Sequence, residues 1–514
     1  MFTDEHRVTV WNEIRQHDLR AFSRFLQAEV IREAAARAGK TLGRGPLHLG
    51  NLLWLALASA LHTTKNFADI LVLTLKLLSD AEGFATTPLA AEQKKGKRRK
   101  KSAQRSKHDP RRLDPTEVSE EAFVKSRQRV PLEFWLALLV ILAERFQSQH
   151  GQFVGWKGFR LLALDGTTIP LDSWQPLTEH FGTSSNGPGK GRRRTTQARM
   201  LLLQFPLTRI PYAYELCPYT TSEKTAAIGL LSRLQDQDLV LLDRGFWSYG
   251  LFWQIQRQNA FFGIRLFKTA GLKHLRKLGP KDRLVEYAPT DRKWRKEGLP
   301  RSITLRRIDY QIPGFRPSAV VTNVLDPSVT AREDWVRLST ESEPGRRLDS
   351  GLYHRRWEIE TSFSELKVIQ GMRKDNLRSR TPEGIAFEIA GHLLFYLLVR
   401  WMMVEAAVQH GCEPLRLSFT HALRELHDLS EKLITASPSR VRRVLLPRLL
   451  ARVASHLVPL RPGRHYPRPN DTKPKNTGKG RIRLPHKMLT KSTKPKKHGL
   501  PAIPKVSSIG HRPT

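Results

Sequence analysis

Cysteine is scarce in this sequence. Only Cys217 and Cys412 occur among its 514 residues, too few for a disulfide framework or for a zinc site built on cysteine thiolates. A small secreted fold held together by disulfide bonds is therefore excluded, and the composition indicates a reducing compartment.

Apolar runs that would cross a membrane are also lacking. The run at 52–61 is too short for a bilayer, and the longer run at 384–404 contains Glu388, His392 and Arg400. We expect both runs to be buried helices. The N-terminal segment is polar, without the apolar stretch of a secretory signal, so a cytoplasmic location and no membrane partner are expected.

Acidic residues are few relative to basic ones. The chain has 48 Asp and Glu residues against 87 Lys and Arg residues, a net charge of +39 and a pI near 10.7. Such an excess repels itself unless a polyanion neutralises it, so nucleic acid is the leading partner class. Ribosomal and chromatin proteins share this balance, so charge alone does not identify an activity.

The hydrophobic pattern divides the chain into segments of different character. Two segments are basic and poor in apolar residues, which predicts a solvated linker and a disordered tail. In chain order we predict an all-α N-terminal domain (1–93), a basic linker (94–115), the first part of a core (116–267), a β-rich insertion (268–348), the second part of the core with a helical C-terminal region (349–460) and a basic disordered tail (461–514).

Within the core, the periodicity changes from helical to strand-like at residue 158. Short loops between the first three runs predict antiparallel strands, and helical crossovers before the last two predict parallel neighbours. A capping box from Thr220 to Glu223 is expected to begin the first crossover helix. The order is that of an RNase H-like core, an α/β fold with a mixed sheet flanked by helices. Its strands are expected at 159–164, 198–205, 210–216, 239–242 and 261–266.

Two aspartates follow predicted strands. Asp165 comes after the first strand, where a turn with Gly166 is expected, and Asp243 comes after the fourth. The carboxyl ends of adjacent strands are where α/β sheets place their sites. A strand-terminal aspartate is also a common turn cap, so neither residue alone identifies a site.

A predicted helix carries four polar side chains on one stripe. At about 100° per residue, Tyr353, Arg356, Glu360 and Lys367 fall within about 60° of one another. An amphipathic helix with an Arg356–Glu360 pair is the alternative interpretation. The apolar residues beside the stripe are expected in the core: Leu352, Ile359, Phe363 and Leu366.

Asp165, Asp243 and Glu360 would repel one another if folding gathered them. At about 4 Å, each pair costs on the order of 4 kcal/mol at an effective dielectric constant near 20. Two divalent cations reverse that sign, and they can activate a water or a 3′-hydroxyl and stabilise the leaving oxygen of an in-line displacement. Oxygen ligands without a Cys or His cluster favour Mg²⁺ or Mn²⁺ over Zn²⁺.

These residues resemble the signature of a known family. The helix reads Tyr353-His-Arg-Arg356-Trp-Glu-Ile-Glu360-Thr-Ser-Phe-Ser-Glu-Leu-Lys367, and the aspartates stand in Leu164-Asp165-Gly166-Thr167-Thr168 and Asp243-Arg244-Gly245-Phe246. Over roughly residues 30–430 the chain resembles a bacterial insertion-sequence transposase of the DDE type, in the insertion sequence 4 family.

The resemblance implies cut-and-paste DNA transposition through nicking at the element ends, a hairpin intermediate and strand transfer. Asp165, Asp243 and Glu360 would be the catalytic acids and the ligands of two Mg²⁺ ions, for which Mn²⁺ can substitute. The remaining signature residues, Tyr353, Arg356 and Lys367, would bind DNA phosphates. It also implies a homodimer that pairs the two element ends, which carry terminal inverted repeats, and joins them to target DNA near the bacterial nucleoid. The basic helices of the N-terminal domain are expected to read the repeats.

Hairpin-forming relatives hold a flipped base with a tryptophan of the insertion. The matching position here is near Ser318, while Trp294 and Trp335 lie not far away in the sequence. Each of these tryptophans has packing in the core as its alternative role.

A glycine-rich basic loop is a further candidate DNA contact. Its glycines would let backbone amides approach phosphates, although it lacks the Lys-Ser/Thr ending of a P-loop. A solvated turn is the alternative. The residues that we predict to bind DNA are Lys190, Arg192, Arg193 and Arg194.

Two other functions remain open. One is a DNA-binding protein derived from a transposase, its nuclease idle. The other is a different RNase H-like nuclease, such as a resolvase, which would account for the three acids but not for the Tyr-Arg-Glu-Lys stripe.

Overall fold

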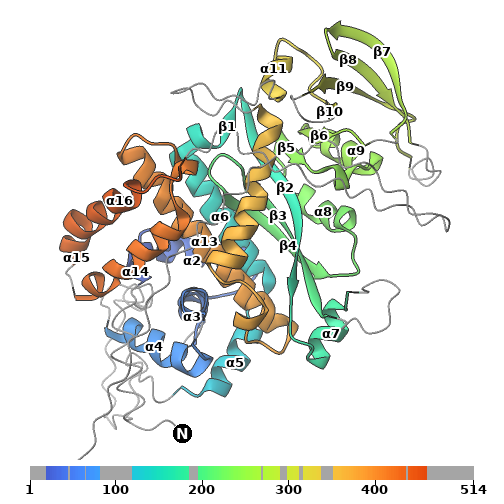
Figure 1. Ribbon diagram of the computed structural model, residues 1–514. Coiled ribbons are helices and arrows are strands. Elements are labelled where there is room, and N and C mark those ends of the chain that lie inside the picture. The colour runs from blue at the N-terminus through green and yellow to red at the C-terminus, as the bar shows by residue number, and fades with distance from the viewer. Residues whose placement is uncertain are drawn as a thin grey trace, which may run out of the picture. The chain divides into compact units, whose positions relative to one another are not determined.

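Ten strands form one mixed sheet in the part of the chain that the structure describes (Figure 1). The predicted linker at 94–115 and the predicted tail at 461–514 lie outside this part. The structure is a computed structural model, and it describes residues 19–43, 47–63, 65–80, 118–184, 195–267, 270–289, 298–311, 317–336, 351–435 and 438–459.

The centre of the sheet is β2 (Phe159–Pro170). On one side it pairs antiparallel with β3 (Gln197–Phe205), which pairs antiparallel with β4 (Ile210–Pro218). On the other side β2 pairs parallel with β5 (Asp238–Leu242), and β5 pairs parallel with β6 (Phe261–Arg265). The five predicted core strands and their directions are confirmed, and the order β4-β3-β2-β5-β6 is that of an RNase H-like core.

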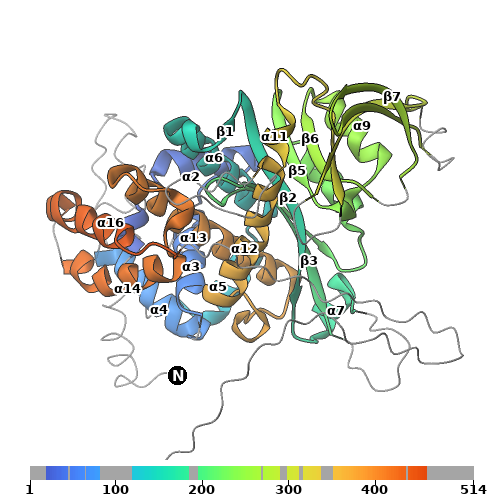
Figure 2. The same ribbon diagram turned by 45° about the horizontal axis from the view of Figure 1, so that its top comes forward.

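The strands of the insertion extend this same sheet. From β6 outward they are β10 (Ser318–Thr322), β9 (Ile303–Tyr310), β8 (Asp282–Tyr287) and β7 (Leu272–Gly279), all antiparallel. The insertion thus contributes four strands to the sheet. Figure 2 shows β7 at the outer edge of the sheet, curving away from the helical layer.

Helices cover both faces of the core strands (Figure 1). The crossover helices α8 (Glu223–Leu231) and α9 (Tyr249–Arg257) lie on one face. On the other lies the helical layer, which includes α6 (Leu132–His150) and α13 (Pro382–Gln409). The remaining elements are α2 (Ala28–Arg37), α3 (Leu49–Leu61), α4 (Phe67–Asp80), α5 (Glu120–Gln128), α7 (Gln175–Phe181), α11 (Arg332–Trp335), α12 (Glu358–Ser364), α14 (Phe419–Thr435), α15 (Pro438–Arg440) and α16 (Leu446–Ala454), a two-residue strand β1 (Gly155–Trp156) paired with β2, and short turns of 3₁₀ or π helix: η1 (Leu19–Phe22), η3 (Gly151–Phe153), η4 (Arg244–Phe246), η5 (Leu352–Trp357), η6 (Glu365–Ile369), η7 (Lys374–Asn376), η8 (Pro414–Arg416) and η9 (Val441–Leu445).

Helix α13 is the core of the helical layer. It begins at Pro382, and its N-cap is Thr381, whose hydroxyl accepts a hydrogen bond from the Gly384 N–H at 3.3 Å. A hydroxyl cap followed by proline in the first helical position is a common helix start. It is long and apolar enough to span a membrane, but 94% of its most apolar stretch is buried inside the protein. The prediction of a buried helix over 384–404 is confirmed.

The helices near the N-terminus share a core with α13. Phe22 packs edge-on against Phe395 at 5.6 Å between ring centroids, and Phe25 lies 4.5 Å from Trp401. Helix α3 crosses α13 at Gly391, where an added Cβ would lie only 2.5 Å from the Ala56 carbonyl oxygen. The segment around η1 (Leu19–Phe22) and helix α3 are thus anchored on α13 through aromatic contacts and a close backbone crossing.

The turn predicted at Asp165 and Gly166 is wrong. Strand β2 passes through both residues and continues to Pro170. The reason is its antiparallel neighbour β3, which keeps pairing from Ala163 to Pro170, whereas the shorter parallel strand β5 stops at the pair Leu164–Leu242.

The capping box predicted from Thr220 is also wrong. Helix α8 begins at Glu223, and its N-cap is Ser222, whose hydroxyl accepts a hydrogen bond from the Thr225 N–H at 3.1 Å. A hydroxyl residue next to the first helical turn satisfies a free N–H group there, and Thr220 is two residues too early to do so.

The crossing of α3 and α13 is testable by Gly391→Ala. Because the added methyl would meet backbone and not a flexible side chain, we expect the free energy of unfolding to fall by about 1–3 kcal/mol, measured by urea denaturation. Gly151→Ala is the matched control, since its Cβ would meet nothing within 4 Å, and it should change stability by less than about 0.5 kcal/mol. Equal unfolding midpoints for the two variants would contradict the close crossing.

Candidate active site

The two aspartates lie where the parallel pairing of β2 and β5 ends. The last paired residues are Leu164 and Leu242, and each is followed directly by an aspartate. Asp165 stays in β2, whereas Asp243 leaves the sheet and caps η4. Neighbouring parallel strands end at the same edge of a sheet, so both carboxylates are presented at one place.

The signature helix approaches this edge in three short pieces and not as the single regular α-helix that the stripe assumed. Tyr353 and Arg356 lie on the 3₁₀ segment η5, Glu360 lies on α12, and Lys367 lies on the π-helical segment η6. The four apolar residues expected beside the stripe are all buried, which confirms the predicted buried face: Leu352, Ile359, Phe363 and Leu366.

Arg356 contacts all three acids. Its Nη1 lies 3.3 Å from Asp165 Oδ2, and its Nη2 lies 2.9 Å from Glu360 Oε1 and 3.7 Å from Asp243 Oδ1. Three carboxylates that lie at least 78 residues apart in the sequence are thus gathered around a single guanidinium. The stripe residues Arg356 and Glu360 do form the expected i,i+4 pair, but this pair is part of the cluster.

The electrostatics of the cluster follow from burial and crowding. Burial raises the pKa of Asp165 to about 6; the Gly166 N–H and Arg356 oppose this rise, and Asp243 and Glu360 add to it. Burial alone would lower the pKa of Arg356, but nearby groups, the three carboxylates among them, outweigh it and raise that pKa. The acids therefore destabilise one another's charge and stabilise a cation placed among them.

The donor set fits hard divalent cations. It consists of carboxylate oxygens from two strand ends and one helix, converging on a place that already holds a positive group. Within the described ranges, no three His, Cys, Asp or Glu side chains are close enough together to enclose a metal ion; here the Arg356 guanidinium contacts all three acids. The Gly166 N–H binds Asp165 Oδ1 at 2.8 Å, and Asp165 Oδ2 contacts Arg356.

Tyr353 ties the strand ends together. Its hydroxyl accepts a hydrogen bond from the Arg265 N–H and donates one to the Leu242 carbonyl, both at 3.1 Å. Leu242 immediately precedes Asp243, and Arg265 ends β6, so the hydroxyl bridges β5 and β6 just past their last paired residues. Burial raises the pKa of this hydroxyl.

Lys367 contacts β2, the strand that carries Asp165. Its ammonium donates to the Thr168 carbonyl at 2.7 Å and to the Thr167 hydroxyl, three and two residues after Asp165. Burial lowers the pKa of Lys367. The signature helix is therefore fastened at one end to β5 and β6 through Tyr353 and at the other end to β2.

A buried ion network behind the helix was not predicted. Arg209, in the turn between β3 and β4, donates to Glu358 at 2.8 Å and to Glu365 at 2.7 Å. Glu365 also accepts from the Tyr396 hydroxyl at 2.6 Å and from Arg400. The available signal was Arg400 itself, because a cation inside an apolar run demands a buried acid.

Tryptophans near the site have different surroundings. Trp335 is fully buried, and its Nε1 donates to Thr330 Oγ1 at 2.9 Å, so it is a core residue. Trp294 lies outside the described residues. Trp357, which sequence reasoning passed over, is 47% exposed, and its ring lies 5.8 Å from the Arg356 Cζ.

The four predicted DNA-binding residues of the glycine-rich loop are not among those the structure describes. The description ends at Ser184 and resumes at Thr195, so the structure bears on none of them: Lys190, Arg192, Arg193 and Arg194.

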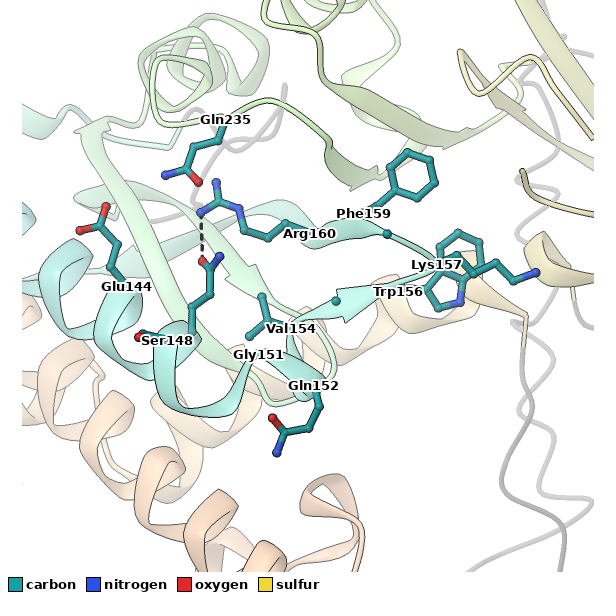
Figure 3. A pocket seen from close by; sticks show the side chains of 13 residues that line it. Glu144, Ser148, Gly151, Gln152, Val154, Trp156, Lys157, Phe159, Arg160 and Gln235 are labelled. Atoms are coloured by element: carbon teal, nitrogen blue, oxygen red, sulfur yellow. Dashed lines mark hydrogen bonds between the residues drawn. The ribbon is translucent and has the colours of Figure 1, made fainter. Parts of the chain in front are cut away.

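A surface hollow of about 650 Å³ lies away from the acids (Figure 3). It is formed by the end of α6, by η3 and by the beginning of β2, where Arg160 donates to Gln147 at 3.2 Å. These residues stand at the opposite end of the β2–β5 ladder from Asp165. We regard this hollow as separate from the candidate site.

Comparisons with known proteins find similarity to transposases. Residues 156–398 match the family described as Transposase DDE domain. Transposase InsG for insertion sequence element IS4 of Escherichia coli (strain K12) is 30% identical over 370 residues, which cover 68% of this chain and 76% of that protein. Among solved structures, the cryo-EM structure of piggyBac transposase synaptic complex with hairpin DNA aligns with a TM-score of 0.31 and 10% identity over 66% of this chain and 65% of that chain. The match spans slightly less than two thirds of the piggyBac chain.

Tyr353→Phe tests whether the hydroxyl braces the strand ends. The change keeps the ring and removes both hydrogen bonds, so we expect the free energy of unfolding to fall by about 1–3 kcal/mol and amide hydrogen exchange to accelerate in a peptide covering 261–267. Tyr214→Phe is the control, because the buried Tyr214 hydroxyl has no hydrogen-bond partner in the described residues. Unchanged exchange at 261–267 in Tyr353→Phe would refute the brace.

Proposed function

This chain belongs to the insertion sequence 4 family of DDE transposases, enzymes that cleave DNA and transfer its strands, and we propose that Asp165, Asp243 and Glu360 are its catalytic acids. The observation that carries the proposal is the contact of one guanidinium with all three carboxylates. No other arrangement among the described residues combines the family signature with acids at the ends of adjacent parallel strands.

Enzymes of this family use divalent metal ions, and we propose that the ions here are two Mg²⁺, with Mn²⁺ as a substitute. Asp165, Asp243 and Glu360 would hold them. Bound there, the ions would lower the pKa of an attacking water or 3′-hydroxyl and stabilise the leaving oxygen. The protein's part is to keep the three carboxylates at one edge of the sheet, which Tyr353 and Lys367 support by fastening the signature helix to the strands.

DNA is the partner, and we propose that it consists of the terminal inverted repeats of an insertion sequence and of target DNA in a bacterial cytoplasm, near the nucleoid. A homodimer would pair the two ends. The net charge of +39 supplies the attraction to phosphates. We further propose that the segment 1–93 reads the repeats and that the loop with Lys190 and Arg192 adds phosphate contacts.

The insertion offers a further basic surface. In the edge strand β7, residues Lys273–Lys277 are all exposed, and they include three cations of Lys and Arg type. An exposed edge rich in lysine also guards a sheet against pairing with other chains. We favour contact with the DNA backbone, because this ribbon belongs to the same sheet as the strand that carries Asp165.

Trp357 is proposed as the aromatic that meets an unstacked base. It is exposed, whereas Trp335 is buried, and it neighbours the guanidinium that contacts the acids. An exposed indole provides a stacking face for any base that leaves the duplex.

Asp165→Asn and Glu360→Gln test the assignment of the acids. Each variant should lower Mg²⁺-dependent nicking of DNA that carries the element ends by at least about a hundredfold, because even outer-shell changes at metal sites cost about 10–100-fold. DNA affinity should stay within about threefold, measured by fluorescence anisotropy. Asp172→Asn is the control, because this acid is close in sequence but lies at the surface, where it pairs with Lys374 at 3.2 Å.

Two outcomes would contradict this assignment. Nicking that persists in Asp165→Asn would remove that residue from the site. A wild-type protein that binds the ends but never nicks them would instead support the catalytically idle, transposase-derived DNA-binding protein.

Trp357→Ala tests the base-stacking role. Stacking is worth about 1–3 kcal/mol per base, so the rate of hairpin formation at the element end should fall by about fivefold or more. A substrate whose end base is unpaired should restore much of that rate, since unpairing no longer has to be driven. Trp174→Ala is the control, because Trp174 is similarly exposed at 42% but stacks on Arg380; equal rates for the two variants would refute the assignment.

A further inference from the structure

We propose that Arg356 is an internal counter-ion of the acidic cluster, which holds the place of the metal ions and yields it when they bind. Its guanidinium would then become free for a phosphate only at a metal-loaded site. This inference rests on the proposed function, because it takes Asp165, Asp243 and Glu360 to be the metal ligands.

The charge balance of the cluster supports the proposal. Three carboxylates face one guanidinium, which is a cation deficit of two charges. No other Lys, Arg or His side chain in the described ranges lies within 4 Å of any of these acids. The second cation of the signature, Lys367, is bound to Thr167 and Thr168 instead, so Arg356 alone balances the cluster.

The positions of the groups make binding of Arg356 and of metal mutually exclusive. Magnesium ions bind carboxylate oxygens at about 2.0–2.1 Å, and one oxygen of each of the three acids now lies 2.9–3.7 Å from an Arg356 nitrogen. A divalent ion ligated by these oxygens would share their space with a positive group of like charge. The guanidinium must therefore withdraw from at least some of its contacts before the ligand shell closes.

The location of Arg356 permits that withdrawal. It lies on the 3₁₀ segment η5, next to the junction with α12 that carries Glu360, and such junctions are common sites of local adjustment. Glu358 and Glu365, by contrast, are held by Arg209. The helix behind Glu360 is thus fixed, and the Arg356 side chain is free to change its partners without moving that acid.

Two simpler roles for Arg356 make different predictions. A purely structural ion pair would lower stability when removed, and metal ions would not compensate. A residue that only binds phosphate would affect DNA affinity and leave metal affinity unchanged. An internal counter-ion competes with metal, so its removal strengthens metal binding in the absence of DNA.

The experiment measures Mn²⁺ binding to the full chain without DNA, by electron paramagnetic resonance of free Mn²⁺, together with the thermal midpoint in EDTA and in Ca²⁺. For Arg356→Gln we expect an apparent Mn²⁺ affinity about tenfold or more above that of the wild type. The reason is that Mn²⁺ no longer has to displace the guanidinium from the acids. The midpoint should be lower in EDTA and rise further with Ca²⁺. Arg356→Lys should lie between, because an ammonium keeps the charge but cannot reach three acids with one fork.

The control is Arg355→Gln, the neighbouring cation, which pairs with Glu413 at 3.9 Å and not with the cluster; its Mn²⁺ affinity should equal that of the wild type. Equal or weaker Mn²⁺ affinity in Arg356→Gln would overturn the inference. Failure of the proposed function looks different, because then neither the wild type nor Arg356→Gln would bind Mn²⁺, and Glu360→Gln would change nothing.

Discussion

The repulsion among three carboxylates and its relief by a cation is the interaction on which the rest of this structure depends. Two of the acids leave the same end of the parallel β2–β5 ladder, and the third arrives on a helix from 117 residues further along the chain than Asp243. Holding like charges together costs free energy, so the surrounding contacts have to supply it. The hydrogen bonds of Tyr353 to β5 and β6 and of Lys367 to β2 fix the signature helix to the strands. The ion network of Arg209, Glu365 and Arg400 fixes the same helix to the turn between β3 and β4 and to α13.

The helical layer serves the same purpose at a longer range. Helix α13 buries its apolar length under the sheet, and its two buried charged residues, Glu388 and Arg400, are both paired with groups outside the helix. Arg400 binds Glu365 of the signature region, and Glu388 accepts from the Arg378 and Ser379 N–H groups in the segment that links that region to α13. The buried charges thus specify where the signature helix ends and how it meets the core, a role for which apolar residues would be too permissive.

Much of the fold and the gathering of the three acids at one place could be predicted from the sequence, because apolar runs indicate strands and the signature spacing indicates a shared helix face. The prediction of a strand end at Asp165 failed, because the length of a strand depends on the strand with which it pairs. Pairing with β3 carries β2 through Asp165, and no local signal reveals that partner's length. The hydrogen-bond partners of Tyr353 and the exposure of Trp357 could not be predicted either. Periodicity indicates which face of a helix is buried, but not which backbone groups that face contacts or which side chains remain exposed to solvent.

The strands of the insertion are continuous with the core sheet, since β10 pairs with β6 over Val320–Thr322. Strand β6 ends at Arg265, whose N–H is bound by the Tyr353 hydroxyl, and the same hydroxyl holds the peptide that leads into Asp243. A displacement of the outer ribbon would therefore be conveyed through one continuous hydrogen-bonded sheet to the strand end that precedes Asp243. The DNA contact proposed for that ribbon would then be coupled, through this sheet, to the position of one of the proposed catalytic acids.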